Sequence, residues 1–261
     1  MAYKKLKYWF DKELTVMLSN KITCINPDFE SKKFIKAVEH KVPNLELKDR
    51  IEVIADELKE TLTNSYPENV NLLIQILGPE NKKETGMFTN YYWIMPIAKY
   101  IEKYGMDYYE ISMDAIAEIT KRSTGEYTIR PYIEVYPVLT LKTMLLWSEN
   151  ENKHLRRLSC EGLRPRLPWA KKMDIFIENP KPIIPILNNL KDDKSRYVQK
   201  SVANCLNDIL KDNLEIGKVI IEKWKINPSK ERQWIIKHSL RNLLKKQDDW
   251  AMKILSLNNQ D

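Results

Sequence analysis

The sequence predicts an all-α protein built from HEAT-like helical repeats, and two observations favour this fold class. First, apolar residues recur at helical spacing in nearly every segment, and short polar or proline-bearing breaks separate the segments. Second, the C-terminal half repeats itself. HLRRLSCEGL (154–163), YVQKSVANCL (197–206) and WIIKHSLRNL (234–243) align without gaps. Spacings of about 40 residues are typical of two-helix HEAT repeats, so we expect stacked helix pairs with a concave face.

Each apolar segment predicts one helix. In the N-terminal half the predicted helices cover about 5–20, 30–40, 46–63 and 67–78, followed by an aromatic helix that ends at a C-cap, Gly105. A further helix over 154–164 should end because Pro165 removes a backbone donor. Pro168 suits the first turn of the next helix, which predicts Trp169 at a helix start. We expect residues 1–261 to form a single domain, a curved solenoid.

The composition is that of a globular protein with a basic surface. The 261 residues carry a net charge of +7 and a sequence pI near 9.0, which makes nucleic acid a reasonable partner. Only 6 glycines occur, fewer than a dinucleotide-binding fold usually needs. The 3 cysteines and 3 histidines are scattered, so we expect reduced thiols, no metal and no cofactor. No apolar run of about 18 residues occurs, so we expect a cytoplasmic protein without a membrane span.

The repeat alignment predicts which side chains share a surface. Arg157 aligns with Lys200 and Lys237, and Glu161 aligns with Asn204 and Arg241, while Asp208 follows one helical turn later. The alignment thus predicts a concave surface lined by cations, with Glu161 and Asp208 as acidic exceptions. Such a basic stripe is typical of phosphate binding. The alternative is the ordinary solvated side of an amphipathic helix pair, with Arg157 and Glu161 as an exposed ion pair.

Three segments carry a family resemblance. They are GEYTIRPY (125–132), the segment 156–169 with its core SCEGLRPRLPW, and SVANCLND (201–208). Together they resemble the AlkC/AlkD HEAT-like alkylpurine DNA glycosylases, and more specifically the AlkC branch. The middle segment is the most specific, because many uncommon residues stand in fixed order. Cys205 departs from the histidine expected in many relatives, and Leu163 from a small polar residue. The immunoglobulin-like domain that one branch carries after the solenoid is expected to be absent.

The resemblance implies a monofunctional DNA glycosylase without lyase activity. It would release N-alkylated cationic bases, of the 3-methyladenine and 3-methylcytosine class, from double-stranded DNA. By motif position the implied active-site residues are Glu126, Glu161, Asp208 and Trp169. The candidate DNA-binding residues are Arg157, Arg164, Arg166, Lys200, Lys237 and Arg241. We expect a monomer that lies on the nucleoid when it is bound to DNA.

These residue types suit the chemistry, but each has a plainer interpretation. Carboxylates can stabilise a sugar cation and position water, and an indole favours a cationic base. However, Glu126 could close a capping box with Ser123, Asp208 could form a surface pair with Lys211, and Trp169 could lie in the core. The alternative function is a non-catalytic HEAT scaffold that binds nucleic acid or protein through the same face. A relative that recognises lesions without turnover is a third reading.

Overall fold

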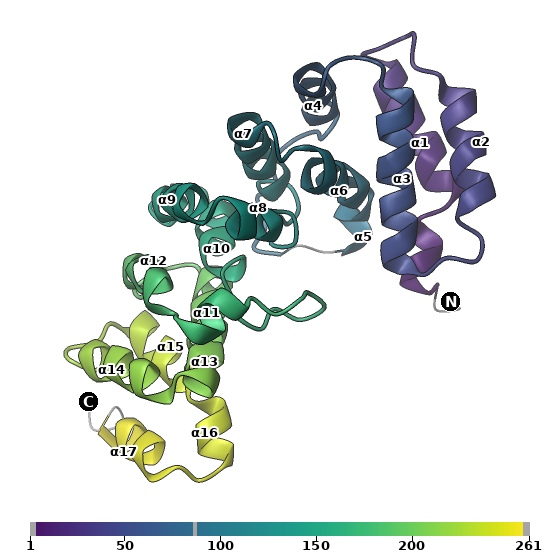
Figure 1. Ribbon diagram of the computed structural model, residues 1–261. Coiled ribbons are helices and arrows are strands. Elements are labelled where there is room, and N and C mark those ends of the chain that lie inside the picture. Colours follow the sequence, from purple (N-terminus) through teal and green to yellow (C-terminus); the bar gives the residue numbers. More distant parts are fainter. Residues whose placement is uncertain (1–3, 86–87, 258–261) are drawn as a thin grey trace. The chain divides into compact units, whose positions relative to one another are not determined.

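A computed structural model describes residues 4–85 and 88–257, and within these ranges every regular element is a helix (Figure 1). The all-α prediction is therefore confirmed. The chain divides into two compact units, Met1–Tyr132 (unit 1) and Ile133–Asp261 (unit 2). The expectations of a single domain over 1–261 and of a curved solenoid with a basic concave face stay predictions. Among the described residues no helix has the length and apolarity needed to cross a bilayer.

Unit 1 holds the helices up to the GEYTIRPY segment. Helices α1, α2 and α3 pack side by side, α3 also packs on α6, and α4, α6 and α7 contact one another. The helices, in chain order, are η1 (Leu6–Trp9), α1 (Lys12–Thr23), α2 (Ser31–Lys41), α3 (Leu47–Thr61), α4 (Tyr66–Gln75), α5 (Phe88–Tyr91), η2 (Tyr92–Ile94), α6 (Met95–Tyr104) and α7 (Tyr109–Thr120).

Local sequence explains several helix ends in unit 1. The Asp11 side chain caps α1 by accepting a hydrogen bond from the backbone N–H of Glu13, and Ser65 with Glu68 forms a capping box at α4. Gly105 is the C-cap of α6, as predicted. A side chain at position 105 would collide with the hydroxyl groups of its neighbours, so only glycine fits there.

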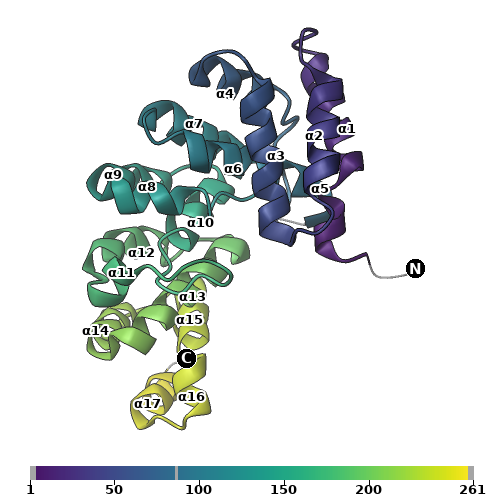
Figure 2. The same ribbon diagram turned by 45° about the vertical axis from the view of Figure 1, so that its right-hand side comes forward.

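Unit 2 is built as two rows of helices. Helices α10, α13 and α15 pack against one another in sequence and form the inner row, and α9, α12 and α14 form the outer row behind them (Figure 2). The helices are α9 (Pro137–Trp147), α10 (Lys153–Glu161), α11 (Asp174–Glu178), η3 (Lys181–Ile183), α12 (Ile184–Leu190), α13 (Arg196–Asp212), α14 (Leu214–Trp224), α15 (Lys230–Ser239), α16 (Arg241–Lys245) and α17 (Asp249–Leu257); α8 (Ile129–Val135) begins in unit 1 and ends in unit 2.

The three inner helices are the three segments that the repeat alignment identified. Each begins at a polar N-cap whose side chain accepts a backbone N–H: Asn152 for α10, Ser195 for α13 and Ser229 for α15. Their apolar faces meet in a core that includes Leu158, Cys160, Val202, Cys205, Leu206, Ile235 and Ile236, all fully buried. Cys24 is exposed, and the three cysteines are free thiols. The alignment thus located the stacked units correctly.

The segment after α10 differs from its prediction. Helix α10 ends at Glu161, with Gly162 as C-cap, three residues before the predicted end. The prediction that Pro168 opens the next helix is wrong, because α11 begins only at Asp174. Residues 162–173 instead form a loop, closed where the backbone N–H of Met173 donates to the carbonyl of Pro165 at 3.0 Å. Two prolines interrupt the helical hydrogen-bond pattern within four residues, and side-chain anchors described below hold the loop in place.

Candidate active site

Two carboxylates come together between α10 and α13. Glu161 is the last residue of α10 and Asp208 lies three turns into α13, and these two inner helices pack directly against each other. Both side chains are buried, with 7% and 8% of each residue exposed. The sequence alternative that made Asp208 an exposed partner of Lys211 is therefore wrong. Burying a carboxylate is costly unless it is paired, so its partners determine what it can do.

Arg164 is the partner that the two carboxylates share. Its Nη1 donates to Glu161 Oε1 at 2.8 Å and its Nε donates to Asp208 Oδ2 at 3.0 Å. The Ser201 hydroxyl donates to the second oxygen of Glu161, Oε2, at 2.6 Å. We call Glu161, Arg164, Ser201 and Asp208 the carboxylate cluster. A planar guanidinium with donors in fixed directions can hold two carboxylates at a set separation, which a lysine cannot do.

The environment shifts the pKa values of the two carboxylates in opposite directions. Burial acts to raise the pKa of Glu161, but the charges of Arg157 and Arg164 and the Ser201 hydrogen bond outweigh it and hold that pKa below its usual value. Burial raises the pKa of Asp208 above its usual value, although Arg164 opposes this shift. Two neighbouring carboxylates whose pKa values respond differently to their surroundings are suited to different chemical roles.

The loop 162–173 is fastened to α13 next to these carboxylates. Arg166 Nε and Nη2 donate to the carboxylate of Asp212 at 2.6–3.0 Å, and the backbone N–H of Arg166 hydrogen-bonds to Asp208. Leu163, Leu167 and Met173 are buried under the loop. Both ends of the loop are therefore anchored, and its middle is presented outward from unit 2.

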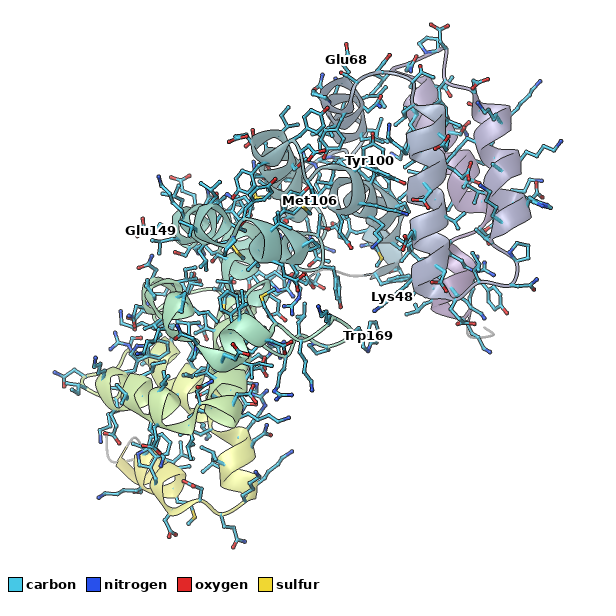
Figure 3. The ribbon with its side chains drawn as sticks, viewed as in Figure 1. Lys48, Glu68, Tyr100, Met106, Glu149 and Trp169 are labelled. Atoms are coloured by element: carbon cyan, nitrogen blue, oxygen red, sulfur yellow. The ribbon has the colours of Figure 1, made fainter. Side chains whose placement is uncertain are left out.

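Trp169 lies at the tip of this loop (Figure 3). It is 74% exposed and its φ is 64°, which places it in the left-handed region that bulky side chains rarely occupy. The alternative of a core tryptophan is therefore wrong, and so is its predicted place at a helix start. An anchored loop that holds a large aromatic ring in solvent, at a strained backbone position, is typical of a ligand contact.

Glu126 belongs to unit 1 and is described there alone. It is buried, with 7% exposed, in the non-helical segment that precedes α8. The capping-box alternative with Ser123 is wrong, because no helix starts there; α8 begins at Ile129, whose backbone N–H donates to the carbonyl of Gly125 at 3.0 Å. Its place in the same active site as Glu161 stays a prediction.

The candidate DNA-binding residues fall into two groups. Arg164 and Arg166 hold carboxylates, as described above, and Arg157 Nη2 lies 3.8 Å from Glu161 Oε1 while its guanidinium stacks over Tyr197 at 4.8 Å. Lys200 and Lys237 are exposed, and Arg241 donates to Asn204 Oδ1 at 3.0 Å. The lysines are thus available to an external phosphate. A role in DNA binding stays a prediction for all six residues.

Sequence reasoning missed several residues of this region. Ser201 belongs to the SVANCLND segment and lies seven residues before Asp208, so both side chains face α10. Of this segment, only Asp208 is among the predicted active-site residues. Asp212, which binds Arg166, is not among the predicted site residues. Trp234 aligns with Tyr197 in the repeat, and this aromatic column was the signal for the stacked side chains of α13 and α15. Among the described residues no cluster of histidines, cysteines and acids is suited to a metal.

Fold and cluster together define a helical-repeat protein with a buried, arginine-bridged pair of carboxylates. A family model described as DNA alkylation repair enzyme matches residues 107–243, which is more than half of the chain. The chain therefore belongs to the DNA alkylation repair enzyme family.

Individual relatives agree with this assignment. The structure resembles Pseudomonas fluorescens alkylpurine DNA glycosylase AlkC bound to DNA containing an abasic site analog, with a TM-score of 0.89, 31% identity, and coverage of 97% of this chain and 69% of that chain. The uncharacterized protein YhaZ of Bacillus subtilis (strain 168) is 35% identical over 98% of this chain and 69% of its own. AlkD2 from Streptococcus mutans shares the fold, with a TM-score of 0.55, 22% identity, and coverage of 80% and 96%. The HEAT-like fold class is confirmed.

Proposed function

We propose that this chain is a DNA glycosylase that hydrolyses the N-glycosidic bond of N-alkylated cationic bases, of the 3-methyladenine and 3-methylcytosine class. The observation that carries the proposal is the carboxylate cluster, in a family member similar to an alkylpurine DNA glycosylase. A surface that only binds phosphates gains nothing from buried carboxylates, because anions repel the backbone of DNA. Their presence is explained by a reaction that develops positive charge.

The role of Glu161 follows from its ionised state. A base alkylated on a ring nitrogen is cationic and departs neutral, so bond cleavage needs no general acid, and the positive charge remains on the sugar. Glu161 keeps its negative charge because its pKa is lowered by Arg157, Arg164 and Ser201. A fixed anion with little water around it stabilises a developing sugar cation electrostatically.

The role of Asp208 follows from its raised pKa. A carboxylate with a raised pKa is a better proton acceptor than an ordinary aspartate. We assign to it the task of orienting a water molecule and accepting its proton as the oxygen attacks the sugar. The product is an abasic site and a free base, without strand cleavage.

Trp169 and Glu126 contact the lesion in this proposal. An indole face attracts a cationic base more than a neutral one by about 0.5–2 kcal/mol, which selects alkylated bases. The exposed position of Trp169 at the tip of an anchored loop supports this role. Glu126, a buried carboxylate matched by family motif, assists in holding the water or the lesion.

In this proposal DNA is held by cations of unit 2. Lys200 and Lys237 are exposed, and they contact phosphates together with Arg241 and Arg157. Arg164 and Arg166 also position Asp208 and the loop 162–173. AlkC is bound to DNA containing an abasic site analog, which supports DNA as the partner, and we propose that this DNA is double-stranded. We propose that the protein acts as a monomer.

The test is release of free bases from methylated duplex DNA, analysed by chromatography for wild type and Asp208→Asn. We expect wild type to release 3-methyladenine or 3-methylcytosine, and the variant to be slower by about 10²–10³-fold, as when one preorganised catalytic group is removed. The matched control is Asp193→Asn. Asp193 is an aspartate of unit 2 whose side chain is only 5% exposed, and it pairs with Arg156 at 2.6 Å, outside the carboxylate cluster.

The outcomes separate the proposal from its alternative. Loss of release in Asp208→Asn, with release retained in a folded Asp193→Asn, supports the glycosylase. No release by wild type, with intact salt-sensitive DNA binding, would support a non-catalytic scaffold and make the cluster structural. Equal release by wild type and Asp208→Asn would remove Asp208 from the mechanism.

A further inference from the structure

Three flat side chains stack on one another where α13 meets α15. The guanidinium of Arg196 lies over the ring of Trp234, with Cζ 4.1 Å from the ring centroid. The imidazole of His238 stacks on the same indole, with centroids 4.6 Å apart and planes 13° from parallel. We call Arg196, Trp234 and His238 the Trp234 stack. Trp234 holds two nitrogen-bearing groups in defined orientations, which lowers the entropy lost when they bind a ligand.

Three cations around this stack, Arg196, Lys200 and Lys237, are not paired with acids of the described residues. Among the described residues no carboxylate forms a salt bridge with Arg196, Lys200 or Lys237, and Arg196 and both lysines are exposed. The nearby acids are already engaged: Asp193 with Arg156, Asp192 with Arg232 and Glu231 with Lys194. A group of unpaired cations beside paired ones is an electrostatic footprint for an external anion.

His238 stands in the middle of these cations. Within the described part of the chain its ring nitrogens have no hydrogen-bond partner, and the ring is partly buried. Burial lowers the pKa of His238, and Arg241, Lys200 and Arg196 lower it further. These charges come from α13 and from α16; Lys237 stands beside it on α15, and α14 contributes none of the charges that act on it. The imidazole is neutral in the free protein at neutral pH, and an anion nearby would favour its protonation.

The stack is connected to the carboxylate cluster along α13. Arg196, Lys200, Asn204 and Asp208 follow one another at intervals of four residues, so each lies one turn further along the helix and about 40° further around it. Twelve residues of helix span about 18 Å, which exceeds the reach of a single nucleotide. A duplex with its lesion at Asp208 therefore has phosphates available for a second contact region at this distance.

We propose that the Trp234 stack extends the DNA-contact surface of Lys200 and Arg241, and that phosphate binding there is coupled to proton uptake by His238. The inference rests on the proposed function, because it takes DNA as the ligand. The phosphates of the bound DNA bring negative charge to His238, and the imidazolium that forms donates a hydrogen bond to a phosphate oxygen. By linkage, the same coupling makes the affinity for DNA rise as pH falls.

The experiment measures binding of the whole protein to a duplex with an abasic-site analogue, by fluorescence anisotropy at pH 7.5 and pH 6.0 and at constant salt. This DNA carries no base to release, so turnover does not interfere. We expect the affinity of wild type to rise about three- to tenfold, since one pKa unit of coupling corresponds to tenfold. His238→Gln should show a clearly smaller rise. Calorimetry in two buffers of different ionisation enthalpy should show proton uptake in wild type and less in the variant.

Matched variants keep the result interpretable. His40→Gln makes the same change at an exposed histidine of α2 in unit 1 and should keep the full pH dependence. His238→Lys carries a permanent charge and should bind tightly at both pH values. Trp234→Phe keeps a ring beneath Arg196 and His238, and it should retain most of the pH dependence if the fold is intact by circular dichroism.

The outcomes also separate this inference from the proposed function. A pH dependence that survives unchanged in His238→Gln would overturn the inference, even if methylated bases are released. A pH dependence that is lost in His238→Gln supports it, even if no base is released and the glycosylase proposal fails. Absence of DNA binding by folded wild type at both pH values would overturn it as well.

Discussion

The carboxylate cluster and the Trp234 stack each lie between two adjacent inner helices, but they differ in whether their positive charges are buried and paired with acids. The cluster lies between α10 and α13, where Arg164 is buried and donates to both Glu161 and Asp208. The stack lies between α13 and α15, where Arg196 is exposed and Lys200 has no salt bridge among the described residues. A buried cation is committed to the carboxylates it holds, whereas an exposed one is available to a ligand. Positive residues on successive inner helices therefore differ in whether an external ligand can reach them.

The largest effect that can test this comparison concerns the stability of the carboxylate cluster. Glu161→Gln leaves Arg157 and Arg164 without their shared counter-charge, so we expect the free energy of unfolding in urea at pH 7 to fall by about 3 kcal/mol. Glu118→Gln removes a partly exposed ion pair with Arg122 and should cost at most about 1 kcal/mol. Equal losses in the two variants would contradict a special role for burial.

The two carboxylates should also differ in how they link stability to pH. The lowered pKa of Glu161 means that its contribution is present above the unfolded-state pKa of about 4.3 and is lost as pH falls through the folded-state value. The raised pKa of Asp208 has the opposite sign, because ionising it in the folded state costs stability at neutral pH. We expect the free energy of unfolding of Asp208→Asn at pH 7 to be no lower than that of wild type. A clear loss would show that its bond to Arg164 outweighs its burial.

A smaller effect is expected at Trp169, the exposed aromatic group at the tip of the loop. Trp169→Ala removes the indole face, so we expect the preference for a cationic base over a neutral modified base, measured as a ratio of kcat/KM values, to fall by about 0.5–2 kcal/mol, or roughly two- to thirtyfold. The melting temperature should stay unchanged, because 74% of the residue is exposed. Trp169→Phe should keep part of the preference. A change in stability without a change in preference would assign Trp169 to folding.

The smallest expected effect is the change in the salt dependence of DNA binding when one exposed, unpaired lysine is removed at a time. Lys200→Ala and Lys237→Ala should each reduce the slope of log K against log salt for duplex binding by about 0.9, the value for one phosphate contact. Lys33→Ala serves as the control, because Lys33 pairs with Glu30 at 2.9 Å on α2 in unit 1 and should leave the slope unchanged. An unchanged slope in both lysine variants of unit 2 would move the phosphate contacts elsewhere.

Sequence reasoning succeeded where the physics is local. Helical periodicity predicted the all-helical fold, and the aligned segments located α10, α13 and α15, because each repeat needs an apolar face and an N-cap. The prediction failed over 162–173. Pro165 was expected to end the helix at Arg164, but α10 ends at Glu161 with Gly162 as C-cap, and proline chemistry does not say how many residues pass before the next helix begins. The loop between the two helices is held by the bond of Arg166 to Asp212, a partner on another helix that the local sequence does not reveal.

The sequence by itself determined the fold class, the repeat and the identity of the two carboxylates, since spacing and residue type are properties of the chain. Only the tertiary structure decided that Glu161 and Asp208 share one arginine, that Ser201 completes the cluster, and that Trp169 is presented to solvent at a positive φ. The physical reason is that pairing, burial and pKa depend on which helices pack together. An exposed arginine can bind a phosphate, whereas an arginine between two buried acids positions them.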